Sequence, residues 1–324
     1  MNKIVYVGAV ELSQVGLDEL LRQGAKPELV VTLRPDFDAR HSDFADLAKL
    51  ADAHDIPVHF VDNINEPALM ERLADLKPDY VFVIGWSQLI KPELLALPAK
   101  GCIGFHFAKL PRNRGRAAIP WVILNRETET GVTLMQLDDG VDSGDIVTQR
   151  SIPVAADERA RTLYDKICLA LRDMMRDVAD DLKSDRTLRT TPQDHSQATY
   201  LAKRSADDGW IDWERPAADI ERLVRAAGKP YPGAFTIYRD RKLIVWEARL
   251  IRSFNHTGVV GQILARDDDA IVIQCGEGWI GAQVVEDEER GGEVRATEFF
   301  TRMHDKVGLN LYQLWRQMRD RKHD

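Results

Sequence analysis

The chain of 324 residues contains no apolar run of the ~20 residues that a membrane-spanning helix requires. Its three cysteines, Cys102, Cys168 and Cys275, stand too far apart for the usual spacing of a metal site. The opening residues MNKIVYVGAV are typical of a strand and lack the apolar core and cleavage site of a signal peptide. We therefore expect reduced thiols, no metal site, no membrane contact and a cytoplasmic location.

Positively charged residues are outnumbered by negatively charged ones. The chain has 44 lysines and arginines against 52 aspartates and glutamates, a formal net charge of −8. This balance disfavours nucleic acid as the main partner, because such binding needs a cationic face. One local exception is the stretch GFHFAKLPRNRGRAAIPW (104–121), whose cationic cluster suits a small phosphorylated ligand.

Two phosphate-binding motifs are missing as well. No G-x-G-x-x-G follows the first strand-like run, and no G-x-x-x-x-G-K occurs. A nicotinamide or nucleoside triphosphate site of the usual kind is therefore disfavoured.

In the first half of the chain, segments with the hydrophobic pattern of strands alternate with segments that have the pattern of helices. Short β-branched runs at 3–8, 28–33 and 79–85 alternate with amphipathic segments of helical spacing. The alternation predicts an α/β fold, with a doubly wound, Rossmann-like parallel sheet covered on both faces. In such sheets ligands bind outside the carboxyl ends of the strands.

The length predicts more than one domain. A long amphipathic stretch, 158–184, ends the first half, and a polar linker follows it. Strand-like runs with turn signals after the linker predict a small β-barrel-like domain, and the end of the chain reads as a helical tail. The expected domains are 1–200, 205–290 for the β-rich domain and 291–324 for the tail.

His106 and an acidic loop are the first candidates for chemistry. His106 stands at the expected end of a strand, and the loop LDDGVDSGDI (137–146) brings four aspartates around two glycines. A carboxylate of this loop can orient an imidazole and help it to hold or donate a proton near pH 7. A hydrogen-bonded structural histidine and a solvated acidic turn are the plain alternatives.

Several motifs of this half occur in the order and spacing of a known enzyme family. The series GWSQLI (85–90), GCIGFH (101–106), LPRNRGRAAIPWVILN (110–125) and TGVTLMQLDDGVDSGDI (130–146) resembles the 10-formyltetrahydrofolate-dependent formyltransferases, and most closely the sugar-nucleotide N-formyltransferases. The resemblance covers residues 1–180 and continues more weakly through 209–235. It implies 10-formyltetrahydrofolate as the formyl donor.

The resemblance also implies residue roles. His106 becomes the catalytic acid or base and Asp142 its partner. The folate-binding residues that it implies are Gln88, Leu89, Ile90, Arg116, Asp138, Asp139, Gly140 and Val141. Neither a metal nor a covalent nucleophile is needed, because the amine itself attacks the formyl carbon.

One family residue is replaced. The family pattern is Asn-x-His, and this chain has Gly104 where the asparagine would donate to the developing oxyanion. Loss of such a donor can cost about 10²–10³ in rate. We expect a small polar space beside His106, in which an ordered water replaces the missing amide.

The acceptor is the least defined part of the prediction. An amino-sugar nucleotide, used in lipopolysaccharide or glycan biosynthesis, comes first, with methionyl-tRNA and a small amine as alternatives. Lys109, Arg112 and Arg114 would meet its diphosphate, and Tyr231 of KPYPGAF (229–235) would stack on its base. A formyltetrahydrofolate hydrolase, a folate-binding protein that has lost transfer and a homodimeric assembly stay open.

Overall fold

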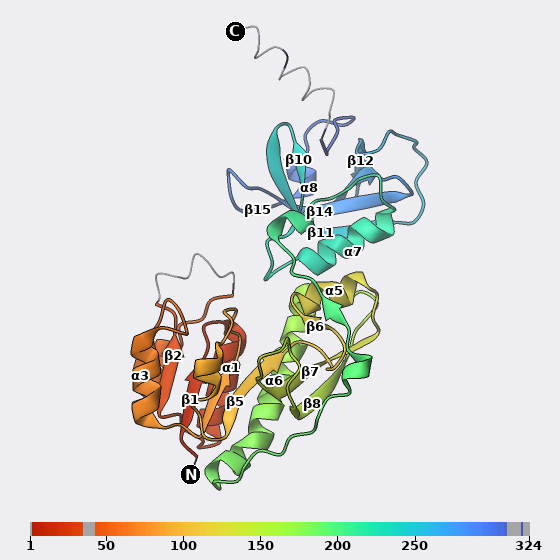
Figure 1. Ribbon diagram of the computed structural model, residues 1–324. Helices are drawn as coiled ribbons and strands as arrows, with labels where there is room; N and C mark the ends of the chain where they lie inside the picture. Colours follow the sequence, from red (N-terminus) through yellow and green to blue (C-terminus); the bar gives the residue numbers. More distant parts are fainter. Residues whose placement is uncertain (1, 35–42, 310–318, 320–324) are drawn as a thin grey trace. The chain divides into compact units, whose positions relative to one another are not determined.

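The computed structural model describes residues 2–34, 43–309 and 319 (Figure 1). The chain divides into two compact units. The first comprises Met1–Val122, Glu127–Ala156 and Thr162–Lys203, and the second comprises Ile123–Arg126, Asp157–Arg161 and Arg204–Asp324.

A seven-stranded sheet forms the centre of the first unit, with strand order β3-β2-β1-β4-β5-β7-β8. The strands are β1 (Ile4–Val7), β2 (Leu29–Thr32), β3 (Val58–Phe60), β4 (Tyr80–Val83), β5 (Gly101–His106), β7 (Glu129–Gln136) and β8 (Ile146–Pro153). The first five are parallel, as the alternating pattern predicted, and β1, β2 and β4 are buried along their whole length. The predicted doubly wound α/β fold is therefore confirmed.

The sheet is mixed rather than wholly parallel. Strand β7 runs antiparallel to β5, and β8 runs antiparallel to β7. The reason is the short connection: loop 137–145 can close a hairpin-like turn, whereas a parallel crossover needs a dozen or more residues. Strand β7 therefore ends beside Ile103, in the first half of β5, and the acidic loop that follows carries Asp142 back to His106 at the end of β5.

Among the described residues, six helices accompany the sheet: α1 (Glu11–Arg22), α2 (Leu47–Asp52), α3 (Pro67–Leu76), α4 (Pro92–Leu95), α5 (Ala118–Leu124) and α6 (Ala160–Lys183). In α1, Leu12, Leu17 and Leu20 recur at helical spacing and are fully buried. A short parallel pair, β6 (Arg114–Gly115) with β9 (Tyr200–Leu201), brings the polar stretch after α6 back to the loop that follows β5.

An antiparallel sheet forms the second unit, in the order β10-β11-β14-β13-β12, with β15 also paired to β14 (Figure 1). Its strands are β10 (Ala234–Tyr238), β11 (Arg241–Ile251), β12 (Ile263–Asp267), β13 (Ala270–Gln274), β14 (Trp279–Asp287) and β15 (Glu293–Arg295). Helix α7 (Ala217–Ala227) packs on this sheet through Ile220 and Val224. The β-rich second region is thus confirmed.

Of the segment 291–324 expected as a tail, the structure describes β15 and the short helix α8 (Ala296–Phe299). Residues 310–318 and 320–324 lie outside the described part of the chain. Among the helices that the structure describes, none is both long and apolar enough to cross a membrane.

Candidate functional site

His106 is the last residue of β5 and is 6% exposed. Its Nε2 atom lies 2.7 Å from the carbonyl oxygen of Asn113, and its Nδ1 atom lies 3.5 Å from Oδ2 of Asp142. The structure therefore brings together the histidine and the aspartate that the sequence pointed to.

Both ring nitrogens of His106 face acceptors. The Asn113 carbonyl can only accept, so Nε2 carries a hydrogen and donates it. The Asp142 carboxylate faces Nδ1, so a hydrogen bound to Nδ1 would be donated to this acceptor. Both ring nitrogens are thus engaged within the protein, and one of these contacts has to open before the ring can exchange a proton with a reacting group.

The position of Asp142 is fixed from two sides. Its Oδ2 atom accepts a hydrogen bond from the backbone N–H of Gly115 at 2.7 Å, and its carbonyl oxygen accepts one from Nε2 of Gln193 at 2.9 Å. The same amide group of Gln193 donates to the carbonyl oxygen of Gly144 at 2.6 Å. These bonds hold Asp142 in a left-handed backbone conformation, φ 49°, that non-glycine residues rarely adopt.

Arg114 is not available to a substrate, contrary to our expectation. It is 2% exposed, and its Nη2 atom lies 2.7 Å from Oε1 of Gln193 and 3.0 Å from Nδ1 of His195. Arg114 thus fixes Gln193, which in turn fixes Asp142. The charge of Arg114 supports the acidic loop from inside the protein.

Gln193 and Asn113 are the site residues that sequence reasoning missed. Gln193 lies in a polar stretch typical of a solvated linker, and the bridge between Ile146 and Thr191 together with the pairing of β6 and β9 carries it to the site. Asn113 acts through its backbone carbonyl, which any residue type would supply. The residue type was the local signal in the sequence, since asparagine tolerates the left-handed conformation that Asn113 adopts, with φ 60°.

Gly104 does not leave the polar space that we expected. A Cβ atom at this position would lie 2.5 Å from Cδ2 and 3.0 Å from Cγ of Leu137. The side chain of Leu137 therefore fills the place of the family asparagine, and an apolar wall disfavours an ordered water there. The water hypothesis is wrong for this conformation, because a residue of the acidic loop occupies the slot.

The loop 85–90 after β4 is held in place by Gln88. Its side chain accepts from the backbone N–H of Ile64 and donates to the carbonyl of Asp62, both at 2.9 Å. Leu89 is 79% exposed, whereas Ile90 is partly buried against the core. The side-chain amide of Gln88 is thus engaged within the protein, and Leu89 presents an apolar surface.

The second expected folate loop is shaped by Asp138, whose carboxylate accepts from Oγ of Ser143 at 2.8 Å and from the N–H of Gly140 at 3.1 Å. Asp139 is exposed, and so is the apolar side chain of Val141, at 57%. Asp138 therefore closes the turn, and its neighbours face outward.

A folate fits these two loops by its chemistry. Trp86, Ile90 and Leu137 pack against one buried cluster, which gives this edge an apolar lining. Within the described residues, the indole Nε1 of Trp86 is buried without a hydrogen-bond partner. A flat heterocycle rich in acceptors would suit both features.

The cationic side chains of the loop after β5 differ in whether they are paired with other side chains. Lys109 is paired with Glu129, whose carboxylate lies 2.9 Å from its Nζ, and this hydrogen bond lowers the pKa of Glu129. Arg112 and Arg116 are exposed. In the described part of the chain, neither guanidinium forms a side-chain hydrogen bond or an ion pair. These two arginines, rather than Lys109 or Arg114, are placed to meet an anion.

A cavity of about 510 Å³ adjoins this loop, within the size range of small-ligand sites. Its lining is partly polar and partly apolar and contains both signs of charge. The lining residues are Lys109, Leu110, Pro111, Arg112, Asn113, Glu127, Glu129, Thr130, Gln149 and Gln197. Because Asn113 also contacts His106, this cavity is our candidate for the acceptor site.

Tyr231 belongs to the second unit. Its backbone N–H donates to the carbonyl of Gly228 at 3.1 Å, one residue after the cis peptide bond between Lys229 and Pro230. Its expected contact with the acceptor stays a prediction.

A cysteine nucleophile and a metal site receive no support in the described residues. Burial raises the pKa of the Cys102 thiol to about 12, which makes this neighbour of Gly104 a poor nucleophile. No group of three or more histidine, cysteine, aspartate or glutamate side chains among residues 2–34, 43–309 and 319 is arranged to hold a metal ion.

Several solved structures resemble this chain. HypX from Aquifex aeolicus, in complex with tetrahydrofolic acid, shares 17% identity at a TM-score of 0.63; the match covers 93% of this chain and 47% of that one. This chain thus spans about half the length of the HypX chains that it matches.

Shorter proteins match as well. The N-formyltransferase from Helicobacter canadensis, in complex with folinic acid and dTDP-3-aminofucose, shares 21% identity over 87% of this chain and 99% of that one, at a TM-score of 0.65. Methionyl-tRNA formyltransferase from Clostridium thermocellum shares 18% identity over 78% of this chain and 96% of that one, at a TM-score of 0.54. At such identities the similarity shows the fold and leaves the substrate open.

Two family profiles match the sequence itself. The profile of the formyl transferase family matches residues 21–178, and that of the formyl transferase C-terminal domain matches residues 203–304. Together they cover most of both units, in the order that the sequence motifs predicted. The chain therefore belongs to the formyltransferase family, a family of one-carbon transferases.

Proposed function

We propose that this protein transfers the formyl group of 10-formyltetrahydrofolate to the amine of an amino-sugar nucleotide. The observation that carries the proposal is the pairing of His106 with Asp142 at the carboxyl end of β5, in a chain that belongs to the formyltransferase family. The folate, when bound, supplies an electrophilic formyl carbon.

His106 does most of the chemical work in this proposal. Acyl transfer to an amine requires a donor for the carbonyl oxygen on which negative charge develops, and a group that takes up the amine proton. The imidazolium form of His106 would donate to that oxygen and then give its proton to the departing folate nitrogen, while Asp142 stabilises the positive charge on the ring. The neutral imidazole that remains would take up the amine proton. Leu137 fills the place of the family asparagine, so His106 carries a larger share of this stabilisation.

Binding of the donor is assigned to the loops 85–90 and 137–142. Leu89, Ile90 and Val141 would contact the apolar parts of the folate, and the N–H of Trp86 would meet an acceptor of its ring. Arg116, exposed beside the acidic loop's anchor Gly115, would pair with a carboxylate of the folate tail.

Two observations support an amino-sugar nucleotide as the acceptor. The net charge of −8 disfavours tRNA, and the Helicobacter canadensis protein was solved with a dTDP-amino sugar. In this proposal Arg112 meets the diphosphate at the cavity beside Asn113. Methionyl-tRNA remains the alternative acceptor.

A second candidate function rests on Gly104 and Leu137. With the asparagine replaced by an apolar contact, the protein would bind the folate and hydrolyse it or leave it intact. The test is a time course of tetrahydrofolate and formate release from 10-formyltetrahydrofolate, with and without a panel of amino-sugar nucleotides. Acceptor-dependent release of tetrahydrofolate without formate supports transfer. Acceptor-independent formate shows hydrolysis, and no release shows a binding protein.

A further inference from the structure

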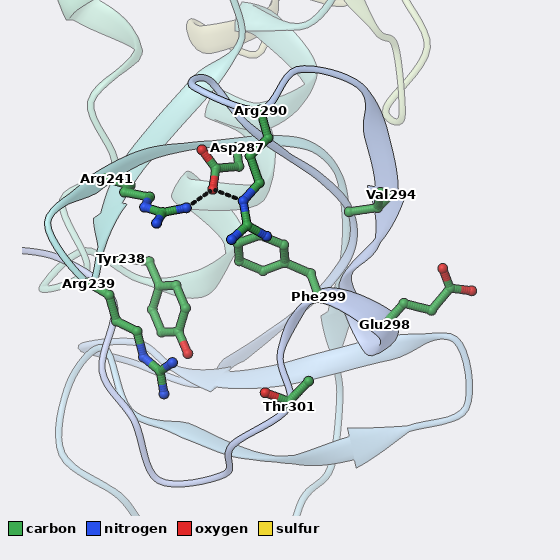
Figure 2. Close-up of a pocket in the computed structure, with 9 residues that line it drawn as sticks. All are labelled: Tyr238, Arg239, Arg241, Asp287, Arg290, Val294, Glu298, Phe299 and Thr301. Carbon is green, nitrogen blue, oxygen red and sulfur yellow. Dashed lines mark hydrogen bonds and ion pairs between the residues drawn. The ribbon is translucent and has the colours of Figure 1, made fainter.

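The cavity beside Asn113 and a cavity in the second unit differ in how their charges are matched. In the second unit, the carboxylate of Asp287 lies between Arg241 and Arg290, so neither of these guanidinium groups is left unpaired (Figure 2). Beside Asn113, by contrast, Glu127 lines the cavity and forms no ion pair with any described residue. The role of this half-buried carboxylate therefore depends on its hydrogen bonds.

The side chain that donates to Glu127 is that of Asn113. Nδ2 of Asn113 lies 3.1 Å from each carboxylate oxygen of Glu127. The rest of Asn113 is held by Thr199, whose hydroxyl accepts from the backbone N–H at 2.8 Å and donates to Oδ1 at 3.4 Å. Because hydrogen bonds to an ionised acceptor are stronger than neutral ones, Glu127 contributes most to fixing the Asn113 side chain.

The backbone carbonyl of Asn113 is the group that faces His106. Its oxygen lies 2.7 Å from Nε2 of the ring. A lone pair on Nε2 would repel this oxygen at such a distance, so the contact requires a hydrogen on Nε2. The hydrogen on Nε2 thus depends on the position of Asn113, which Glu127 and Thr199 fix.

The other ring nitrogen of His106 is held less closely. Nδ1 lies 3.5 Å from Oδ2 of Asp142, and the same oxygen accepts from the backbone N–H of Gly115 at 2.7 Å. Asp142 therefore keeps a hydrogen-bond partner when Nδ1 turns to a reacting group. Of the two contacts of the ring, the one at Nδ1 opens at the lower cost.

We propose that Glu127 is a positioning residue of the formyl-transfer site. Through Asn113, it keeps the hydrogen of the neutral His106 ring on Nε2, so that Nδ1 is the nitrogen that gives and takes the reacting proton. Two acceptors compete for the single hydrogen of the neutral ring, and fixing Asn113 favours its carbonyl over Asp142. The catalytic consequence rests on the proposed formyl transfer, whereas the tautomer is a property of the free protein.

The test is ¹⁵N NMR of the full chain labelled at histidine, without folate or acceptor, with His106→Ala to identify the signals of His106. On the neutral ring of the wild type, the Nε2–H tautomer should dominate. Glu127→Ala should lower the ratio of this tautomer to the Nδ1–H form about tenfold, the loss expected for a hydrogen bond to a charged group. Glu127→Gln keeps an oxygen that can accept from Asn113, so it should restore most of the wild-type ratio.

Formyl transfer by the same variants gives a second readout. The kcat should fall about tenfold in Glu127→Ala and recover in Glu127→Gln, with little change in the KM of the folate. Thr199 is exposed, so Thr199→Ala loosens Asn113 with little risk to folding and should shift the tautomer ratio in the same direction.

The matched control is Glu129→Ala. Glu129 lines the same cavity, but it is paired with Lys109 and does not contact Asn113, so the His106 signals of this variant should match those of the wild type.

The proposal is overturned if the neutral ring of the wild type carries its hydrogen on Nδ1, or if Glu127→Ala leaves the tautomer ratio unchanged. It is also overturned if kcat falls as far in Glu127→Gln as in Glu127→Ala, because the charge of Glu127 would then act on the acceptor amine directly. The expected tautomer ratios in a protein that transfers no formyl group would contradict the proposed function alone.

Discussion

Replacement of Gly104 by asparagine restores the family residue, and we expect it to destabilise the protein. The new Cβ atom would lie 2.5 Å from Cδ2 of Leu137, well inside an ordinary van der Waals contact. The backbone of Leu137 cannot retreat easily, because its N–H donates to the carbonyl of Cys102 at 2.8 Å. The leucine side chain must therefore move.

The expected size follows from the packing. Overfilling a packed site costs typically about 1–3 kcal/mol, so Gly104→Asn should lower the free energy of unfolding by this amount. Leu137→Ala should cost about 2 kcal/mol, at the low end for leucine, because Leu137 is only partly buried. The double variant exchanges one side-chain volume for the other, so its loss should be smaller than the sum by about 1 kcal/mol or more.

The assay is urea unfolding of the four proteins of this cycle, followed by far-UV circular dichroism. Gly291→Asn is the matched control, since a Cβ there meets nothing within 4 Å and asparagine tolerates its positive φ of 66°. Losses that add to within about 0.5 kcal/mol would show that the two side chains do not compete for one space. A further expectation is that the double variant transfers formyl groups faster than Leu137→Ala alone, because its amide gains room beside His106.

Four other predictions concern the same unit. His106→Ala and Asp142→Ala should each reduce formyl transfer severely, and the double change should cost little more than the worse single one; multiplicative losses would argue against a functional pair. Gln193→Leu should lower kcat about tenfold or more with little change in KM, and the kcat of Gln193→Glu should fall as far, since both variants lose the amide donors to the acidic loop. A Gln193→Glu variant with wild-type kcat would contradict this role. Arg112→Ala should raise the KM of the acceptor and leave the folate Kd unchanged, and an unchanged KM would remove it from the site. Burial opposes the ionisation of Glu19, but hydrogen bonds from the side chains of Gln23 and Arg176 lower its pKa below the ordinary value of 4.5. Its stabilisation is therefore present above that pH and lost as the pH falls, so Glu19→Gln should lose less unfolding free energy between about pH 5 and 3 than the wild type.

Helices and strands could be predicted wherever the sequence carries a regular hydrophobic pattern. The buried runs that became β1, β2 and β4 carry β-branched residues without interruption, and α1 carries its leucines at helical spacing. The antiparallel direction of β7 and β8 was missed, because the hydrophobic pattern of a strand does not indicate whether it runs parallel or antiparallel to its neighbour. The short loop 137–145 was the available signal.

The candidate site was predictable in its local parts only. His106 and Asp142 could be paired because His106 ends a strand and Asp142 lies in an acidic loop between apolar segments, in motifs that resemble the formyltransferases. Arg114 was misjudged, since a buried cation and an exposed one look alike within a basic loop. The contacts of Gln193 with Asp142, and of Leu137 with Gly104, join residues far apart in the chain, and only the folded structure brings their side chains together.

The central claim is that the chain moves a formyl group onto an amine. The most direct measurement uses 10-formyltetrahydrofolate labelled with ¹³C in the formyl group and a dTDP-amino sugar, with mass spectrometry and ¹³C NMR of the sugar product. We predict that the labelled carbon appears as a formamide on the sugar with wild-type protein and fails to appear with His106→Ala. Label found only in formate, or remaining on the folate with every amino-sugar nucleotide and with methionyl-tRNA, would contradict the account.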